Sequence, residues 1–181
     1  MHKVAVVVSS LIALFLLNAN VLAFEPDIND KMELDVTRAI LDIKSKDAGI
    51  QKFFDDSAGY AVFPSVGKGG IIVGGAFGRG LVIVNEQVDG YASLSQGTIG
   101  LQLGAQKYAQ FIFFKDSTAL NHFKRGNFEF GAQASAVAIT AGASADAAYD
   151  SGVAIFTNAG GGLMFEGTVG GQRFSYEAKT Q

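Results

Sequence analysis

The sequence predicts an α+β protein: an N-terminal amphipathic helical segment packed on a strongly curved, mostly antiparallel β-sheet or barrel-like sheet, with one short internal helix. Apolar side chains recur at helical spacing within residues 30–56, whereas short apolar runs separated by turn residues follow from Gly59 onward. Glycine is dense inside those runs, above all in Gly59–Gly80 and in the related stretch Ser95–Gln106. Glycine inside apolar strands indicates bends and close backbone approach.

Residues 1–23 predict a secretory signal peptide. A short basic start precedes the apolar run Val4–Leu17, and Val21–Ala23 resembles the end of a signal that a peptidase cleaves. The apolar run is shorter than the roughly twenty residues of a membrane-spanning helix. An uncleaved membrane anchor stays open as the alternative. We therefore expect export to the periplasm or the cell envelope, and a single domain over residues 24–181.

The composition excludes several classes of function. The formal net charge is −3 at pH 7, and a weakly acidic domain is not expected to bind nucleic acid as its main partner. The chain has no cysteine, which excludes disulfides, thiolate catalysis and thiolate metal sites. Stability must therefore come from packing.

The N-terminal segment predicts one or two amphipathic helices over residues 30–56. Asp30 is a suitable N-cap, with Glu33 at the capping-box spacing. The apolar positions follow helical spacing: Met32, Val36, Ala39, Ile40 and Ile43, then Phe53 and Phe54. Lysines and aspartates alternate on the outer face, which we interpret as a solvated surface rather than a membrane-binding one.

The remainder predicts strands around one short helix. The expected strands are Tyr60–Phe63, Ile71–Phe77, Leu81–Val84, 97–106, Tyr108–Phe114, the alternating part of 127–148, 152–158, 162–168 and 171–177. Gly75–Gly80 is expected to bend between two paired strands, with Arg79 at the tip. Tyr108–Phe114 is almost continuously apolar, which is typical of a strand buried on both faces. A helix is expected over 116–125, capped by Asp116 or Ser117 and followed by Gly126.

No motif supplies a reaction centre. Val66–Gly70 resembles a phosphate loop, but Gly69 stands where that motif needs Ser or Thr, and a strand follows instead of a helix. Gly75–Gly80 lacks the strand–helix context of a dinucleotide fingerprint. His122 is the only histidine after the signal, and one imidazole makes neither a zinc site nor a triad. We therefore expect no catalytic residue, no metal and no cofactor.

Two rival functions remain open. A small outer-membrane β-barrel fits the signal peptide and the alternating strands, although the two-sided apolar strand, the internal helix and the polar C-terminus disfavour it. An envelope hydrolase would need a cleft that holds at least two of Asp146, Asp150 and Glu166.

Several motifs resemble one family. The pattern Gly-x-Ala-Val-Phe-Pro-x-Val, Lys68 and the glycine series ending at Gly80 are similar to the signature of the SYLF-domain family. The similarity continues, in the same order, through Ser95–Gln106, Phe128–Ala136, Ala145–Tyr149 and Gly162–Val169. The chain is thus identified as a secreted bacterial member, related to the yeast actin-patch SYLF proteins.

The resemblance implies non-enzymatic phospholipid binding. The basic residues that fall in or beside matching motifs are Lys68, Arg79 and Lys107, which the resemblance makes candidate lipid-binding residues. The expected partner is anionic phospholipid or a membrane surface. Some eukaryotic members bind actin, which an exported bacterial protein does not meet, so actin is not expected. Lipid binding of this kind requires Lys68, Arg79 and the lysines of the N-terminal helix to share one face.

Overall fold

The structure, a computed structural model, describes residues 24–70, 73–99, 105–126, 128–131, 134–159 and 169–180. Its helices are α2 (Lys31–Lys46), the 3-10 helix η1 (Ala48–Ile50), α3 (Gln51–Asp56) and α4 (Ser117–Lys124). Its strands are β1 (Gly59–Gly70), β2 (Val73–Val84), β3 (Gln87–Ile99), β4 (Ala105–Phe114), β5 (Phe128–Glu129), β6 (Val137–Ala138), β7 (Val153–Ala159) and β8 (Arg173–Ala178). The predicted α+β class is confirmed.

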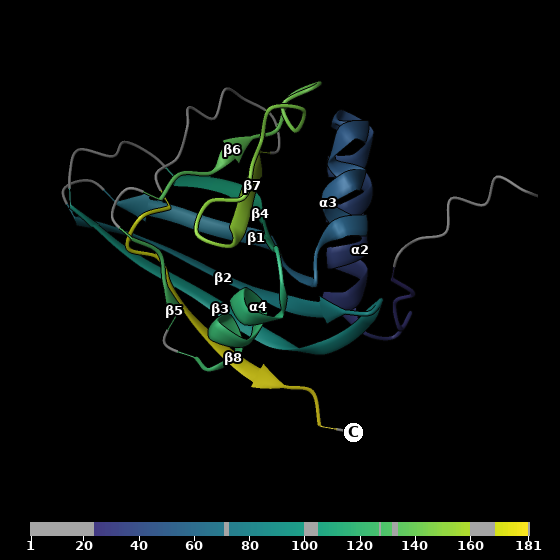
Figure 1. The fold of residues 1–181 in the computed structure, drawn as a ribbon. Coiled ribbons are helices and arrows are strands. Elements are labelled where there is room, and N and C mark those ends of the chain that lie inside the picture. Colours follow the sequence, from purple (N-terminus) through teal and green to yellow (C-terminus); the bar gives the residue numbers. More distant parts are fainter. Residues whose placement is uncertain are drawn as a thin grey trace, which may run out of the picture.

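The strands form one strongly curved sheet in the order β5-β8-β3-β2-β1-β4-β7-β6 (Figure 1). Every pairing is antiparallel except β6–β7, which is parallel. The sheet curls into a half-barrel, with α2 and α3 on one side and α4 on the other, where it contacts β8 (Figure 1). We call the two sides of the sheet the α2 face and the α4 face.

Each face packs its own core. On the α2 face, helix side chains such as Val36 and Ile40 meet the sheet residues Tyr60, Val62, Leu81, Ile83, Ala109, Phe111 and Phe113. On the α4 face, Leu120 and Phe123 meet Ala61, Phe63, Val66, Ala76, Val82, Leu94, Tyr108, Ile112 and Phe114. Because side chains alternate along a strand, these two sets establish which face any neighbouring residue occupies.

Local signals fix the helix ends. The Asp30 carboxylate accepts hydrogen bonds from the backbone N–H groups of Met32 and Glu33, as expected of an N-cap. Glu33 does not complete a capping box: its Oε2 accepts from the Asp27 N–H at 2.7 Å and its Oε1 from Lys179 Nζ at 3.0 Å. Glu33 instead ties α2 to the residues before it and to the C-terminal strand.

The predicted α4 and the two-sided buried strand are confirmed. Asp116 accepts a hydrogen bond from the Ala119 N–H at 3.0 Å, and Gly126 follows the helix with φ +73°. Every residue from Tyr108 to Phe114 is buried, because α2 and α3 cover one face of β4 and α4 covers the other.

The bend predicted at Gly75–Gly80 is wrong: β2 runs unbroken from Val73 to Val84, and Arg79 lies in mid-strand. The glycines allow close contact rather than a turn. A Cβ at Gly80 would lie 2.1 Å from the carbonyl oxygen of Val62 on β1. The chain turns instead at Asn85 and Glu86, whose φ angles are 49° and 63°.

Two other strand predictions are wrong, and a third is not tested. Residues 97–106 are not one strand: β3 ends at Ile99, β4 begins at Ala105, and β2 and β1 lie between them in the sheet. The region 127–148 contains only the two-residue strands β5 and β6 among its described residues, followed by turns. The strand predicted at 162–168, with Glu166, lies outside the described residues.

Candidate functional site

The structure separates the three candidate basic residues. Arg79 pairs with Ser65 and Ser93 and lies on the α2 face, since Leu81 and Ile83 of the same strand do. Lys107 is two residues before Ala109 and shares that face. Lys68 pairs with Ala76 and lies on the α4 face, where it is half-buried. Arg79 and Lys107 thus share a face, and Lys68 does not join them.

The outer part of the α2 face is not covered by a helix. One row of directly paired residues crosses five strands there: Arg173 on β8, Ser95 on β3, Phe77 on β2, Gly67 on β1 and Lys107 on β4. Arg79, Gly75 and Gly97 lie beside this row, and all of these residues are exposed. We call them the bare sheet patch: Phe77, Arg79, Lys107 and Arg173, with Gly67, Gly75, Ser95 and Gly97 between them.

The patch combines an aromatic ring with positive charge. Phe77 is 55% exposed on a strand, although most large apolar side chains of the described residues are buried. Arg173 pairs with Glu129, Nε to Oε2 at 3.0 Å. Arg79 and Lys107 form no ion pair with any residue that the structure describes. Because glycine and serine fill the space between, a partner can approach the backbone closely here.

The lysines of the N-terminal helices make contacts of their own. Lys31 pairs with Asp35 and Lys46 with Asp42. Lys44 lies over the Phe54 ring at 4.4 Å, and burial lowers the pKa of Lys44, an effect that Asp55 opposes. These cations stabilise α2 and α3 and do not extend the patch. The expectation that Lys68, Arg79 and the helix lysines share one face is wrong, because Lys68 lies on the α4 face of the sheet.

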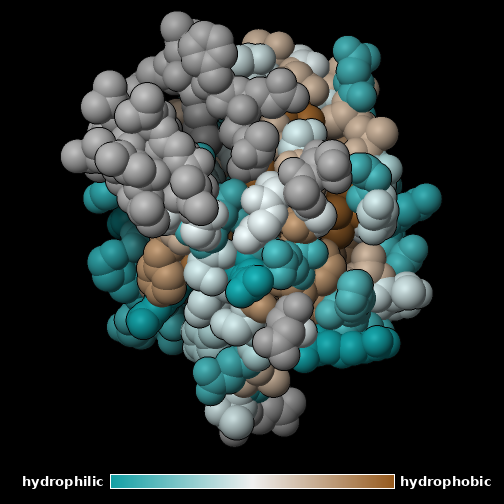
Figure 2. All heavy atoms as spheres, turned by 90° about the vertical axis from the view of Figure 1, so that its left-hand side faces the viewer, coloured by the Kyte–Doolittle hydropathy of each residue, from teal (hydrophilic) through white to brown (hydrophobic). Residues whose placement is uncertain are grey.

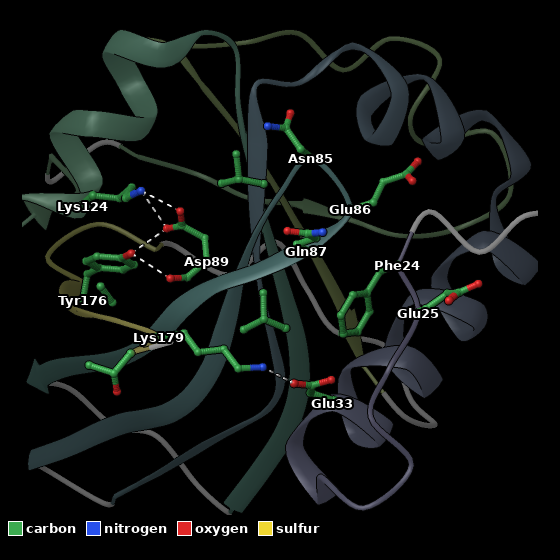
Figure 3. Close-up of a pocket in the computed structure, with 14 residues that line it drawn as sticks. Phe24, Glu25, Glu33, Asn85, Glu86, Gln87, Asp89, Lys124, Tyr176 and Lys179 are labelled. Atoms are coloured by element: carbon green, nitrogen blue, oxygen red, sulfur yellow. Dashed lines mark hydrogen bonds and ion pairs between the residues drawn. The ribbon is translucent and has the colours of Figure 1, made fainter.

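A hollow of about 1,090 Å³ at the described surface, called the polar hollow below, has mainly polar walls (Figure 3). In it Asp89 accepts hydrogen bonds from Lys124 Nζ at 2.8 Å and from the Tyr176 hydroxyl at 2.6 Å. Burial, and then the bond to Asp89, raise the pKa of Tyr176. The Glu33–Lys179 pair lies at another side of the hollow (Figure 3). Glu25 and Glu86 also line the hollow and are exposed, so its carboxylates outnumber its lysines and the hollow is acidic.

A second hollow, 470 Å³, lies between α2 and the sheet, next to the bare sheet patch. Its lining is mainly apolar, and Lys107 lies on its rim.

On the side opposite α2, Figure 2 shows apolar residues in separate brown areas among hydrophilic ones, with no continuous apolar surface over the described atoms.

The two hydrolase candidates that the structure describes, Asp146 and Asp150, do not line a cleft. Asp146 and Asp150 are exposed in a turn region, and Asp150 accepts a hydrogen bond from the Ser151 hydroxyl at 3.0 Å. Neither lines the three hollows found at the described surface. His122 is exposed and packs edge-on against Phe128. Among the described residues, no group of three or more His, Asp or Glu could hold a metal ion.

Phe77 is the site residue that sequence reasoning missed. Its signal was present in the alternation of β2, where Gly75, Phe77 and Arg79 fall on one face. The interpretation of the glycines as a bend hid this alternation.

In the described part of the chain, no helix has the length and apolar character needed to cross a bilayer.

Comparison with known families agrees with the motifs. The model of the Ysc84 family, described as Las17-binding protein actin regulator, matches residues 95–178. The matched segment contains Lys107, whereas Lys68 and Arg79 precede it. No curated protein matches the chain. The match over residues 95–178 is consistent with the SYLF-domain family that the sequence motifs resemble.

Proposed function

We propose that this protein binds anionic phospholipid, or another anionic amphiphile, at a membrane of the bacterial cell envelope, and that the bare sheet patch makes the contact. The observation that carries the proposal is the shared exposed face of Phe77, Arg79 and Lys107. SYLF domains are in general lipid-binding and non-catalytic, which supports this function.

The chemistry of the patch suits a membrane surface. A basic side chain near anionic lipid contributes about 1 kcal/mol, so Arg79 and Lys107 together contribute about 2 kcal/mol. Full burial of a phenylalanine side chain contributes about 1.5–3 kcal/mol, of which the exposed part of Phe77 can supply roughly half. The sum of about 2.8–3.5 kcal/mol corresponds to a dissociation constant of roughly 3–10 mM for one site. We therefore expect reversible binding that weakens as salt rises.

A non-enzymatic role is supported by the state of the titratable groups. In the polar hollow, Asp89 and Glu33 are paired with lysines or a tyrosine, whereas Glu25 and Glu86 are exposed at its surface. Asp146 and Asp150 likewise lie at the exposed surface. A general acid or base needs an accessible group with a perturbed pKa in a cleft. We infer that the protein binds without turnover.

We also propose export through residues 1–23 and residence in the periplasm or at the envelope. The basic start, the short apolar run and the cleavage pattern at Ala23 support this location. N-terminal sequencing of the protein recovered from the periplasmic fraction should begin at Phe24. An intact N-terminus in the membrane fraction would instead show an uncleaved anchor.

Co-sedimentation with vesicles tests the binding. The purified protein is mixed with phosphatidylcholine vesicles, or with vesicles that contain phosphatidylglycerol, at low and high salt. We expect binding to the anionic vesicles at low salt and a marked loss at high salt. Arg79→Glu and Lys107→Glu should each weaken binding several-fold, whereas Lys68→Glu, on the α4 face, is the matched control and should leave it unchanged.

Two outcomes oppose the proposal. Absence of binding to either vesicle refutes lipid binding. Binding that survives Arg79→Glu combined with Lys107→Glu, or that Lys68→Glu weakens equally, refutes the patch as the contact surface.

A further inference from the structure

The 470 Å³ hollow beside the patch is a groove with a structural origin. On one side Ala39 of α2 faces the sheet, and on the other lie Ala109 of β4 and the Pro64-Ser65 step of β1. Alanine at both contact positions leaves space where larger side chains would close the helix on the sheet. Its volume lies within the range of small-molecule pockets.

The β1 bulge shapes the floor of this groove. The pairing of β1 shifts between Val62 and Ser65 on the β2 side, and between Phe63 and Val66 on the β4 side. Pro64 lies at the shift, where a missing N–H is tolerated. The bulge turns Ser65 outward to the exposed surface, so the floor continues into the bare sheet patch at Arg79, the β2 partner of Ser65.

The charges around the groove are uneven. At one end the Asp42 carboxylate accepts from Lys46 Nζ at 3.0 Å and from Asn158 Nδ2 at 2.6 Å. The bond from Lys46 lowers the pKa of Asp42, against the effect of burial, so this end carries a fixed and internally neutralised charge. Along the wall, Arg38 is paired with Asp35 at 2.9 Å.

Lys107 is the lining cation without a carboxylate partner among the described residues. It lies two residues before Ala109 on β4, whereas Asn158 pairs with Ala109 itself. The groove therefore has an apolar middle, a closed ion-pair network at one end and an unpaired cation at the end that meets the patch.

We propose that this groove holds the chain of a single-chain amphiphile, with its anionic head group on Lys107. A fatty-acid carboxylate and the phosphate of a lysophospholipid share this chemistry. The inference rests on the proposed membrane function, because Lys107 belongs to both groove and patch: an amphiphile can pass from a docked membrane into the groove. The larger hollow does not suit such a ligand, because its walls are polar and its carboxylates, which outnumber its two paired lysines, would repel an anionic head group.

Calorimetric titration of the purified protein tests this inference. The probes are laurate and lauroyl-lysophosphatidylglycerol, each below its critical micelle concentration, with dodecyl maltoside as the neutral comparison. We expect one site per chain for at least one anionic probe, and which of the two binds identifies the source of the head group. Lys107→Gln should weaken that binding about tenfold, the effect of losing one charge-assisted hydrogen bond. Equal affinity for dodecyl maltoside would contradict the role of Lys107.

Two variants plug the groove from opposite sides. Ala39→Phe fills it from α2 and Ser65→Phe from β1, and each should weaken probe binding at least about tenfold. Ala141→Phe adds an exposed ring in a turn away from the groove and should change nothing. Thermal melts check that each variant is folded. Unchanged probe binding in a folded Ala39→Phe or Ser65→Phe variant overturns the proposal.

A spectroscopic measurement locates the head group. In laurate labelled with ¹³C at the carboxyl carbon, a nearby ammonium should lower the carboxyl pKa on binding, and Lys107→Gln should remove that shift.

Vesicle co-sedimentation separates the two proposals. If vesicles bind but no monomeric probe does, the groove inference fails and the membrane function stands. If the probe binds in the groove but vesicles do not, the membrane function fails.

Discussion

Lys68 and Arg79 lie on neighbouring strands and point to opposite faces of the sheet. Lys68 pairs with Ala76, and Arg79 pairs with Ser65, three residues before Lys68. An odd separation along a strand reverses the face, so two cations of one glycine-rich segment have different surroundings. Only Arg79 can act together with Lys107 and Phe77. This relationship makes Lys68→Glu a control of equal charge change.

Phe77 should enter the membrane when the patch binds. The chain has no tryptophan, so Phe77→Trp introduces a unique fluorophore. We expect its emission to shift to shorter wavelength with phosphatidylglycerol vesicles, because the indole moves from water into the lipid interface. Ile28→Trp, at a site 78% exposed before α2, should show no shift. Equal shifts at both sites would contradict a contact centred on the patch.

Asp47 should make stability depend on acid. Its buried carboxylate accepts from the N–H groups of Ser144 at 2.7 Å and Gly49 at 3.0 Å. Burial alone would raise the pKa of Asp47, but these hydrogen bonds outweigh it, and the folded pKa lies below its ordinary value of 3.8. A carboxyl group whose pKa is lower in the folded than in the unfolded protein stabilises the fold. This stabilisation is fully present above the pKa of the unfolded state and is lost as the pH falls through the pKa of the folded state.

Asp47→Asn removes this contribution. We expect the free energy of unfolding at pH 7 to fall by about 1–3 kcal/mol, because one backbone N–H loses its acceptor. Below about pH 4 the difference in the free energy of unfolding between the Asp47→Asn variant and the unaltered protein should become smaller. Urea unfolding followed by circular dichroism at pH 7 and pH 3 measures both values. A difference that is independent of pH would show that Asp47 does not act as a carboxylate.

Gly80 should be intolerant of any side chain. A Cβ there would lie 2.1 Å from the Val62 carbonyl oxygen, and relieving that contact requires β1 and β2 to move apart. Gly80→Ala should therefore cost about 1–3 kcal/mol or more of stability. Gly97→Ala is the matched control, because a Cβ at Gly97 meets nothing within 4 Å. We expect its melting temperature to be equal or slightly higher, since alanine costs less entropy in a strand.

Gln110 and Gln172 should behave as a coupled pair. Both are fully buried, and their amides exchange two hydrogen bonds of 2.7 and 3.1 Å. Gln110→Leu leaves the Gln172 amide unsatisfied and should cost about 1–3 kcal/mol of unfolding free energy. In a double-mutant cycle with Gln172→Leu, the two losses should be less than additive by at least about 0.5 kcal/mol. Strict additivity would mean that the pair contributes no mutual stabilisation.

Predictions from short-range signals agreed with the structure. Asp30 and Asp116 begin α2 and α4, because an N-cap depends on an oxygen two or three residues from the N–H groups it satisfies. Tyr108–Phe114 was identifiable as a two-sided strand from its continuous apolar composition. The caps depend on hydrogen bonds between residues two or three positions apart, and the burial of the strand follows from its own apolar composition. Each prediction therefore required only one short segment of sequence.

Predictions that depended on distant pairing failed. Gly78 and Gly80 were interpreted as a bend, whereas their contacts are with Val66 and Val62 on β1. The alternation over 97–106 crosses the ends of two strands that are not neighbours in the sheet. Apolar and polar residues can alternate with a period of two within one strand or over the ends of two successive strands. The alternation alone therefore cannot show whether a segment is one strand or two.

The amino-acid sequence by itself determined the α+β class, the capped helices, the buried strand β4 and the family resemblance, because composition, caps and motifs are local properties. Only the tertiary structure decided which glycines lie in turns and which lie within strands. It also decided that Arg79 and Lys107 share a face that Lys68 does not, and that Phe77 is exposed on that shared face. Sheet register sets the face of every strand residue, and register follows from the partner strand. The candidate site is therefore a product of pairing between distant segments.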